Sequence, residues 1–266
     1  MATSRARAAT RAKSRGSTTS VERAVDVLML FTASPGPTLG ITEIATELDI
    51  SKAVVHRILT SLCDRDVVIA DPETRRYSLG PGVLQLASAY RSRLDLRALA
   101  RQTLEQLSKA TDETATLSLR HGSSRAYVDQ VTPDREVTMT VSLGRMFPLH
   151  AGASSKALLA FLPPDEIDAY LKAPKLETLT PRTIVDAAAL RGELEAIRRL
   201  GYAASFGERQ AGAASVAAPI FDDEGVAGVV SICGPLERFT PHTNDYARRL
   251  LDATASLSAR LGYARR

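Results

Sequence analysis

The sequence predicts a two-domain α+β protein, in which a winged helix-turn-helix domain precedes a larger domain of antiparallel strands and helices. Three observations support this prediction. The chain has 266 residues, enough for two domains of ordinary size. Segments of helical periodicity and two short strands alternate with turns up to about residue 81. Beyond residue 111, the first strands follow one another without intervening helices, which is typical of an antiparallel sheet.

The first domain, residues 20–81, is predicted to hold three helices and a β-hairpin. The helices cover residues 20–33, 41–48 and 51–62, and Ser51 is a good N-cap for the third. The third helix buries a single apolar face, made of Val55, Ile58, Leu59 and Leu62. Two strands, 67–70 and 76–79, flank a turn that contains Pro72. This hairpin is the predicted wing.

The second and third helices are joined by a tight connection at residues 49–51, and together they form a helix-turn-helix. Side chains opposite the apolar face of the third helix can enter a DNA major groove. The candidate DNA-binding residues of this helix and of the wing are Ser51, Lys52, Ala53, His56, Arg57, Thr60, Arg75 and Arg76. We expect Lys52 and Arg57 to donate to guanine or phosphate, and the wing arginines to reach a phosphate or the minor groove. The alternative is an ordinary solvated surface.

Residues 1–19 are predicted to be a disordered basic tail. They contain five Lys or Arg and no acid, in a chain whose net charge is +4. We favour an arm that lies along DNA phosphates. A mitochondrial transit peptide has the same composition, and a leader without any binding role is the third interpretation.

Residues 82–110 are predicted to form a linker helix, and residues 111–266 the second domain. The apolar face of the linker, from Leu96 to Leu107, packs either between subunits or on its own domain. The predicted strands of the second domain cover residues 114–120, 125–131, 137–141, 215–221 and 226–233. Its predicted helices cover residues 154–162, 164–171, 187–200 and 241–261.

Composition limits the remaining function classes. Hydrophobic residues make up 44% of the chain and charged residues 24%, which excludes wholesale disorder. No segment approaches the roughly 18 to 20 apolar residues of a membrane span, and no secretory signal follows the basic N-terminus. Cys63 and Cys233 are far apart and form no CxxC motif. We therefore expect a cytoplasmic protein with reduced thiols, no cofactor, no metal and no membrane contact.

Several short sequences resemble the IclR family of bacterial transcriptional regulators, and together they span nearly everything after residue 19. They are Ser20–Leu28, Glu43–Ala45, Val55–Arg57, Tyr77–Gly80, Leu96–Ala100, Leu149–Lys156 and Val216–Pro219. The resemblance implies a ligand-responsive regulator, more often a repressor, that binds double-stranded operator DNA as a homodimer or a dimer of dimers. Relatives often have hydroxyl residues where this chain has Ala53 and Val54. Base preference is therefore not transferred, and contact with a thymine methyl becomes plausible.

The resemblance also implies a C-terminal domain similar to GAF and profilin-like sensors, with a pocket for a small carboxylate or aromatic metabolite. The sequence Gly152–Ser155 precedes a helix, so its backbone N–H groups can converge on an anion. By resemblance, the pocket walls are Leu143, Met146, Gly152, Ala153, Ser154, Ser205, Ser215, Ser231 and Cys233. Ser205 stands where an acid is frequent in relatives, and Ser215 where cysteine is frequent. Each serine is otherwise a strand hydroxyl bonded to backbone.

We expect no catalytic activity. The four histidines are outside helical ligand spacing, and the chain lacks GxSxG, SxxK and GxxxxGK motifs. Two other classes stay open at this point. One is an enzyme that acts on a small acid and carries an accessory DNA-binding domain, and the other is an architectural DNA binder without a ligand.

Overall fold

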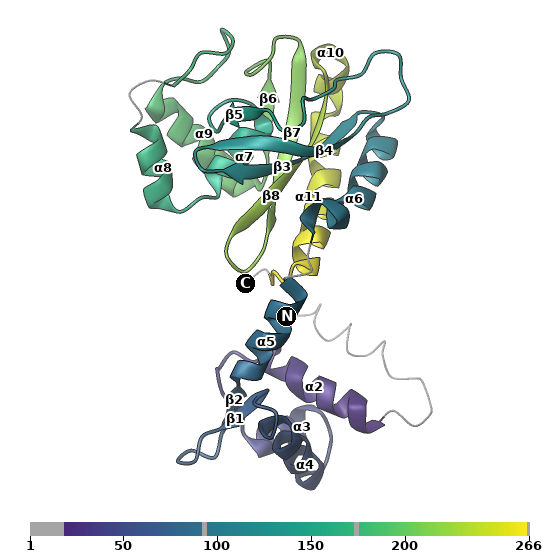
Figure 1. Ribbon diagram of the computed structural model, residues 1–266, viewed down its shortest axis with the longest axis vertical. Coiled ribbons are helices and arrows are strands. Elements are labelled where there is room, and N and C mark those ends of the chain that lie inside the picture. Colours follow the sequence, from purple (N-terminus) through teal and green to yellow (C-terminus); the bar gives the residue numbers. More distant parts are fainter. Residues whose placement is uncertain (1–18, 92–94, 173–175, 265–266) are drawn as a thin grey trace. The chain divides into compact units, whose positions relative to one another are not determined.

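The computed structural model describes residues 19–91, 95–172 and 176–264 (Figure 1). Except for Thr19, the predicted basic tail lies outside these residues. The chain divides into two compact units, Met1–Leu94 and Asp95–Arg266. Along the described part of the chain, no helix combines the length and the apolar character needed to cross a membrane.

The first unit is the predicted winged helix-turn-helix. Its elements are α2 (Thr19–Ala33), α3 (Ile41–Glu47), α4 (Lys52–Cys63), β1 (Val68–Ala70), β2 (Tyr77–Leu79) and α5 (Pro81–Arg91). One buried cluster joins the helices to the hairpin, and Val27, Ile44, Val55 and Leu59 are fully buried in it. Because these residues recur at helical spacing, their burial fixes which side of each helix faces outward.

The second unit is an antiparallel sheet of six strands in the order β5-β4-β3-β8-β7-β6. The strands are β3 (Thr114–His121), β4 (Ser124–Val131), β5 (Met146–Pro148), β6 (Ala203–Phe206), β7 (Ala213–Phe221) and β8 (Val226–Pro235). The helices are α6 (Leu96–Thr111), α7 (Ala153–Ala160), α8 (Pro164–Leu171), α9 (Ala187–Leu200), α10 (Leu236–Phe239) and α11 (Thr243–Arg260). The predicted α+β fold with an antiparallel sheet is confirmed.

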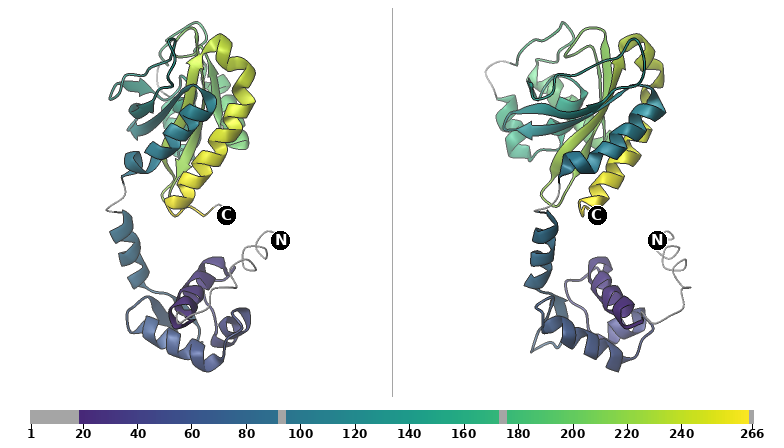
Figure 2. Two further views of the ribbon diagram at one scale, coloured as in Figure 1. Left: turned by 90° about the vertical axis from the view of Figure 1, so that its right-hand side faces the viewer. Right: turned by 45° about the vertical axis from the view of Figure 1, so that its right-hand side comes forward.

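Helices cover both faces of this sheet. Helices α6 and α11 lie side by side on one face, whereas α7 packs on the other and α9 packs on α7 (Figures 1 and 2). Strand β7 alternates accordingly, with Val216 and Ile220 in the core beneath α6 and α11, and Ala217 in the core beneath α7. Successive side chains of a strand point to opposite faces, so one strand contributes to both cores.

The predicted linker helix is two helices, α5 and α6, and only α6 belongs to the second unit. Ala100, Leu104 and Leu107 of α6 are buried in the same core as Leu117 of β3. The apolar face of this segment therefore packs on its own domain, which was one of the two alternatives.

The predicted strand at residues 137–141 is wrong, because side chains replace the hydrogen bonds that a neighbouring strand would make. The Gln130 amide donates to the Val141 carbonyl (3.1 Å) and accepts from the Val141 N–H (2.9 Å). The Thr114 hydroxyl donates to the Met139 carbonyl (2.5 Å). Such side-chain bonds satisfy the backbone groups of an extended segment that is not hydrogen-bonded to a neighbouring strand. The edge strands β5 and β6 were not predicted, since each is short.

Candidate functional sites

Helix α4 presents a polar and basic surface away from the core of the first unit. The Ser51 hydroxyl caps the helix by accepting from the Val54 N–H (3.4 Å). With Val55 and Leu59 fully buried on the opposite side, the exposed residues of α4 include Lys52, Ala53, His56, Arg57 and Thr60. Within the described residues, neither Lys52 nor Arg57 has an ion-pair partner. Both cations are thus available to a DNA phosphate or base edge.

The two arginines of the wing differ in their surroundings. Arg75 lies exposed in the turn, with φ +54°. Arg76 instead donates from Nη1 and Nη2 to the two carboxylate oxygens of Glu43 (3.0 and 2.8 Å), and from Nε to the Thr38 hydroxyl (2.9 Å). This hydrogen bonding lowers the pKa of the Glu43 carboxyl. In this structure the Arg76 guanidinium ties the wing to α3, so the predicted contact of Arg76 with DNA would require it to leave Glu43.

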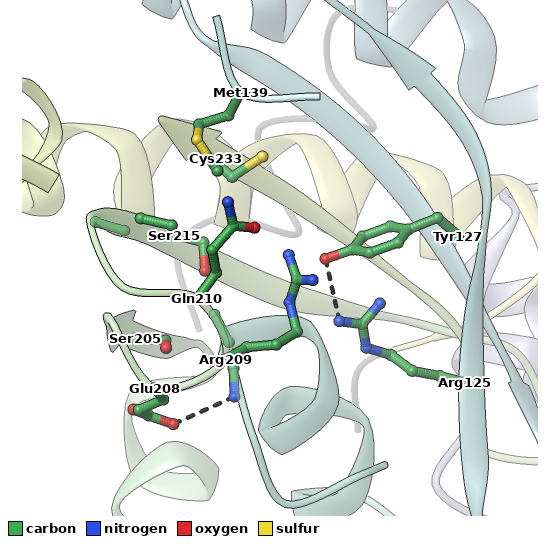
Figure 3. A pocket seen from close by; sticks show the side chains of 13 residues that line it. Arg125, Tyr127, Met139, Ser205, Glu208, Arg209, Gln210, Ser215 and Cys233 are labelled. Atoms are coloured by element: carbon green, nitrogen blue, oxygen red, sulfur yellow. Dashed lines mark hydrogen bonds between the residues drawn. The ribbon is translucent and has the colours of Figure 1, made fainter. Parts of the chain in front are cut away.

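The second candidate site is a pocket between the sheet and the N-terminus of α7 (Figure 3). It is lined by Arg125, Tyr127, Met139, Gly152, Ala153, Ser205, Glu208, Arg209, Gln210, Ala213, Ala214, Ser215 and Cys233. Strand register aligns Ser205, Ser215, Cys233 and Thr114 across four neighbouring strands. A row of small polar side chains therefore crosses the sheet where it borders the pocket, whereas the opposite face is apolar.

Five of the nine predicted pocket residues line it, namely Gly152, Ala153, Ser205, Ser215 and Cys233. Leu143 and Met146 lie outside the lining and are each 48% exposed. Ser154 and Ser231 are buried outside the lining, and Ser231 shares a hydrogen bond of 2.6 Å with Thr116. The Ser231 hydroxyl is thus paired with a side chain on the neighbouring strand, and not with backbone as the alternative for the serines expected.

The N-terminus of α7 already has an anionic partner from the protein itself. The Gly152 N–H donates to Glu208 Oε2 (3.2 Å), and Lys156 Nζ donates to Glu208 Oε1 (2.6 Å) and Glu193 Oε1 (2.7 Å). Lys156 is 1% exposed. The Glu208 carboxylate therefore occupies the N–H of the N-cap residue Gly152, one of the backbone groups that were expected to converge on a ligand's anion.

Several lining residues were missed by sequence reasoning, and they fall into two kinds. Arg125 and Tyr127 share one face of β4, so strand alternation could have placed them together. Glu208, Arg209 and Gln210 lie in the connection between β6 and β7. A loop has no periodicity from which such a position can be inferred.

Two family models match the chain. The IclR helix-turn-helix domain matches residues 20–72, and the C-terminal domain of the bacterial transcriptional regulator IclR matches residues 88–259. The chain belongs to the IclR family. Among curated relatives, the transcriptional regulator KipR of Bacillus subtilis is 34% identical over 91% of this chain and 97% of KipR. The repressor AllR of Escherichia coli is 31% identical over 83% of this chain and 81% of AllR.

Solved structures agree with this family membership. A crystal structure of a protein from Silicibacter sp. TM1040, assigned to the IclR transcriptional regulators, has a TM-score of 0.82 at 32% identity. It covers 92% of this chain and 96% of its own. As an IclR member, the chain is a DNA-binding transcriptional regulator, and its second unit is the effector-binding domain.

Proposed function

We propose that this IclR regulator is a repressor that binds operator DNA through α4, and that a small carboxylate or aromatic metabolite in the pocket releases or alters that binding. The observation that carries the DNA part is the exposed basic surface of α4, with its apolar face locked in the core. A helix-turn-helix reads bases with the N-terminal residues of such a helix.

Individual roles follow from the positions of the side chains. Lys52 and Arg57 donate to guanine or phosphate, and His56 and Thr60 lie on the same exposed surface. Ala53 offers a methyl group to thymine. At the wing, Arg75 is the exposed arginine and contacts a neighbouring phosphate. Ser51 acts first as the cap of α4, and its hydroxyl is engaged there.

Binding DNA specifically requires two copies, because one winged helix reads only a few base pairs and operators mirror a protein's two-fold symmetry. Helix α2 supports such a homodimer, since Val21, Val25 and Met29 are exposed at i, i+4 and i+8. We expect Val25→Glu to shift the mass measured by light scattering towards the monomer. Leu200→Glu, at an exposed leucine of α9, is the matched control and leaves the mass unchanged.

Effector control requires that the ligand bind two states of the regulator with different affinities. The direct experiment is a gel shift on the DNA upstream of the protein's own gene, repeated with a panel of small aromatic and aliphatic acids. We expect binding without ligand and weaker or altered binding with at least one acid. DNA affinity that no acid changes would contradict the regulatory part of this proposal.

Two further measurements separate this function from the other classes. A sensor gains about 2.7 kcal/mol of stability at a ligand concentration 100 times its dissociation constant, whereas an architectural binder gains none. An enzyme would convert the acid, and a regulator returns it unchanged. We expect the acid to bind without being converted, and mass spectrometry of the acid after incubation with the protein tests this.

A further inference from the structure

Two arginines, Arg125 and Arg209, face the pocket, and no carboxylate in the described part of the chain forms an ion pair with either. Arg125 is 1% exposed, and its hydrogen bonds go to three neutral hydroxyls, Ser155 Oγ (2.7 Å), Ser118 Oγ (3.1 Å) and Tyr127 OH (3.1 Å). Among the described residues, neither Arg125 nor Arg209 forms an ion pair. A buried cation without a counter-ion costs folding free energy, so its retention calls for a functional reason.

The two positive charges converge on one pair of aromatic rings. The Arg125 guanidinium carbon lies 4.2 Å from the centre of the Tyr127 ring, and that of Arg209 lies 4.7 Å from the centre of the Phe147 ring. The Arg209 side chain extends from its loop towards the Tyr127 hydroxyl, which also meets Arg125 (Figure 3). Burial is the main cause that lowers the pKa of Arg125, and repulsion by Arg209 adds to it.

The carboxylate in the pocket lining is committed elsewhere. Glu208 accepts from Lys156 (2.6 Å) and from the Gly152 N–H (3.2 Å), and its side chain is only 10% exposed. Lys156 also binds Glu193 (2.7 Å), so three side chains form a closed ionic cluster beside the pocket. Glu208 therefore cannot turn to Arg125 without leaving a buried ammonium group short of a partner.

We infer that the anionic group of the effector binds between Arg125 and Arg209, beside the Tyr127 hydroxyl. This inference rests on the proposed effector function and narrows its ligand class to oxyanions, carboxylate or phosphate. Arg125 uses three of its five N–H groups, which leaves one on each terminal nitrogen for the ligand. Paired guanidinium groups bind oxyanions in a planar, bidentate geometry.

An uncharged analogue is rejected by the same arrangement. It leaves both cations unpaired and loses charge-assisted hydrogen bonds, and a site built for a charged group discriminates strongly on that basis. The hydroxyls of Ser205 and Ser215 line the pocket and remain for the rest of the ligand.

The test compares acids with their uncharged counterparts on the full chain. The probes are acetate, benzoate, succinate and inorganic phosphate, set against acetamide, benzamide and succinamide, with binding followed by thermal shift and calorimetry. We expect at least one acid to bind and its amide to bind at least tenfold more weakly. The carboxylate and phosphate arms show which oxyanion the site prefers.

Variants assign the binding to the two arginines. We expect Arg209→Gln to weaken binding of the acid tenfold or more, whereas Arg145→Gln changes the affinity for the acid less than threefold. Arg145 is the matched control, because it is an exposed arginine 5.3 Å from the Phe147 ring centre and outside the pocket lining. Arg125→Gln has the same effect as Arg209→Gln. Arg209 is only half-buried, so its variant keeps the test valid if Arg125→Gln fails to fold.

The ligand-free melting temperature separates a binding role from a structural one. For Arg209→Gln, removing an unbalanced cation leaves that temperature unchanged or raises it, whereas removing a structural arginine would lower it without affecting the preference for acid over amide. Three results would overturn the inference: equal binding of acid and amide, full affinity in Arg209→Gln, or no acid that stabilises the wild type. If an acid binds through Arg209 but leaves DNA affinity unchanged, the regulatory proposal fails and this one stands.

Discussion

Removing the Glu208 carboxylate is predicted to destabilise the second unit, and the structure sets the size of the effect. Lys156 is 1% exposed and bonds to Glu208 (2.6 Å) and Glu193 (2.7 Å). Breaking a buried ion pair by deleting one partner costs about 3 to 5 kcal/mol. Because Glu193 still binds Lys156 in the Glu208→Gln variant, we expect about 2 to 3 kcal/mol. For a domain of this size that lowers the melting temperature by about 4 to 12 °C.

A double-mutant cycle gives this prediction its sharpest assay. Urea and thermal unfolding followed by circular dichroism are measured for Glu208→Gln, Lys156→Met and the double variant. The double variant removes the stranded charge, so it recovers at least half of the loss. Glu195→Gln, an exposed glutamate of α9, makes the same charge change and costs less than about 0.5 kcal/mol. Wild-type stability in Glu208→Gln, or simple additivity in the double variant, would refute the reasoning.

Two other predictions concern packing and thiol reactivity. A Cβ at Gly234 would lie 2.3 Å from the buried Glu113 carboxylate, which Arg238 holds, so we expect Gly234→Ala to lower the free energy of unfolding in urea by about 1 to 3 kcal/mol. An added Cβ at Gly192 in α9 meets no atom, so Gly192→Ala should raise the free energy of unfolding, and a change of the same sign in both variants would contradict this reasoning. Burial raises the pKa of Cys233 to about 12, so the thiolate forms only in strong alkali. Mass spectrometry of native protein treated with iodoacetamide at pH 8 should find Cys233 unmodified, and rapid labelling there would show that the pocket thiol is not desolvated.

Sequence patterns predicted the elements that carry their own boundary signals. Helices α8 and α9 have the predicted bounds, because Pro164 begins the first, Asp186 caps the second and Gly201 ends it in a left-handed conformation. Nothing in the sequence of residues 137–141 indicates which groups its backbone bonds to. Its backbone bonds to side chains of β3 and β4, which only the tertiary structure brings near.

The two candidate sites differ in how far sequence could predict them. The surface of α4 follows from one helical period, since burying Val55 and Leu59 leaves Lys52 and Arg57 outside. The pocket depends instead on the register between strands and on a loop. Resemblance to the family placed five lining residues correctly, but the position of Arg209, in a loop, follows only from the three-dimensional structure.

The central claim is that the exposed basic surface of α4 reads operator DNA. Fluorescence anisotropy of a labelled upstream fragment, at one salt concentration, tests it with Arg57→Ala and with Arg199→Ala, an exposed arginine of α9. We predict a loss of about 1 to 3 kcal/mol, roughly 5- to 150-fold, for Arg57→Ala if it contacts a base, and less than about twofold for the control. Wild-type DNA affinity in Arg57→Ala, with the fold intact, would contradict the account.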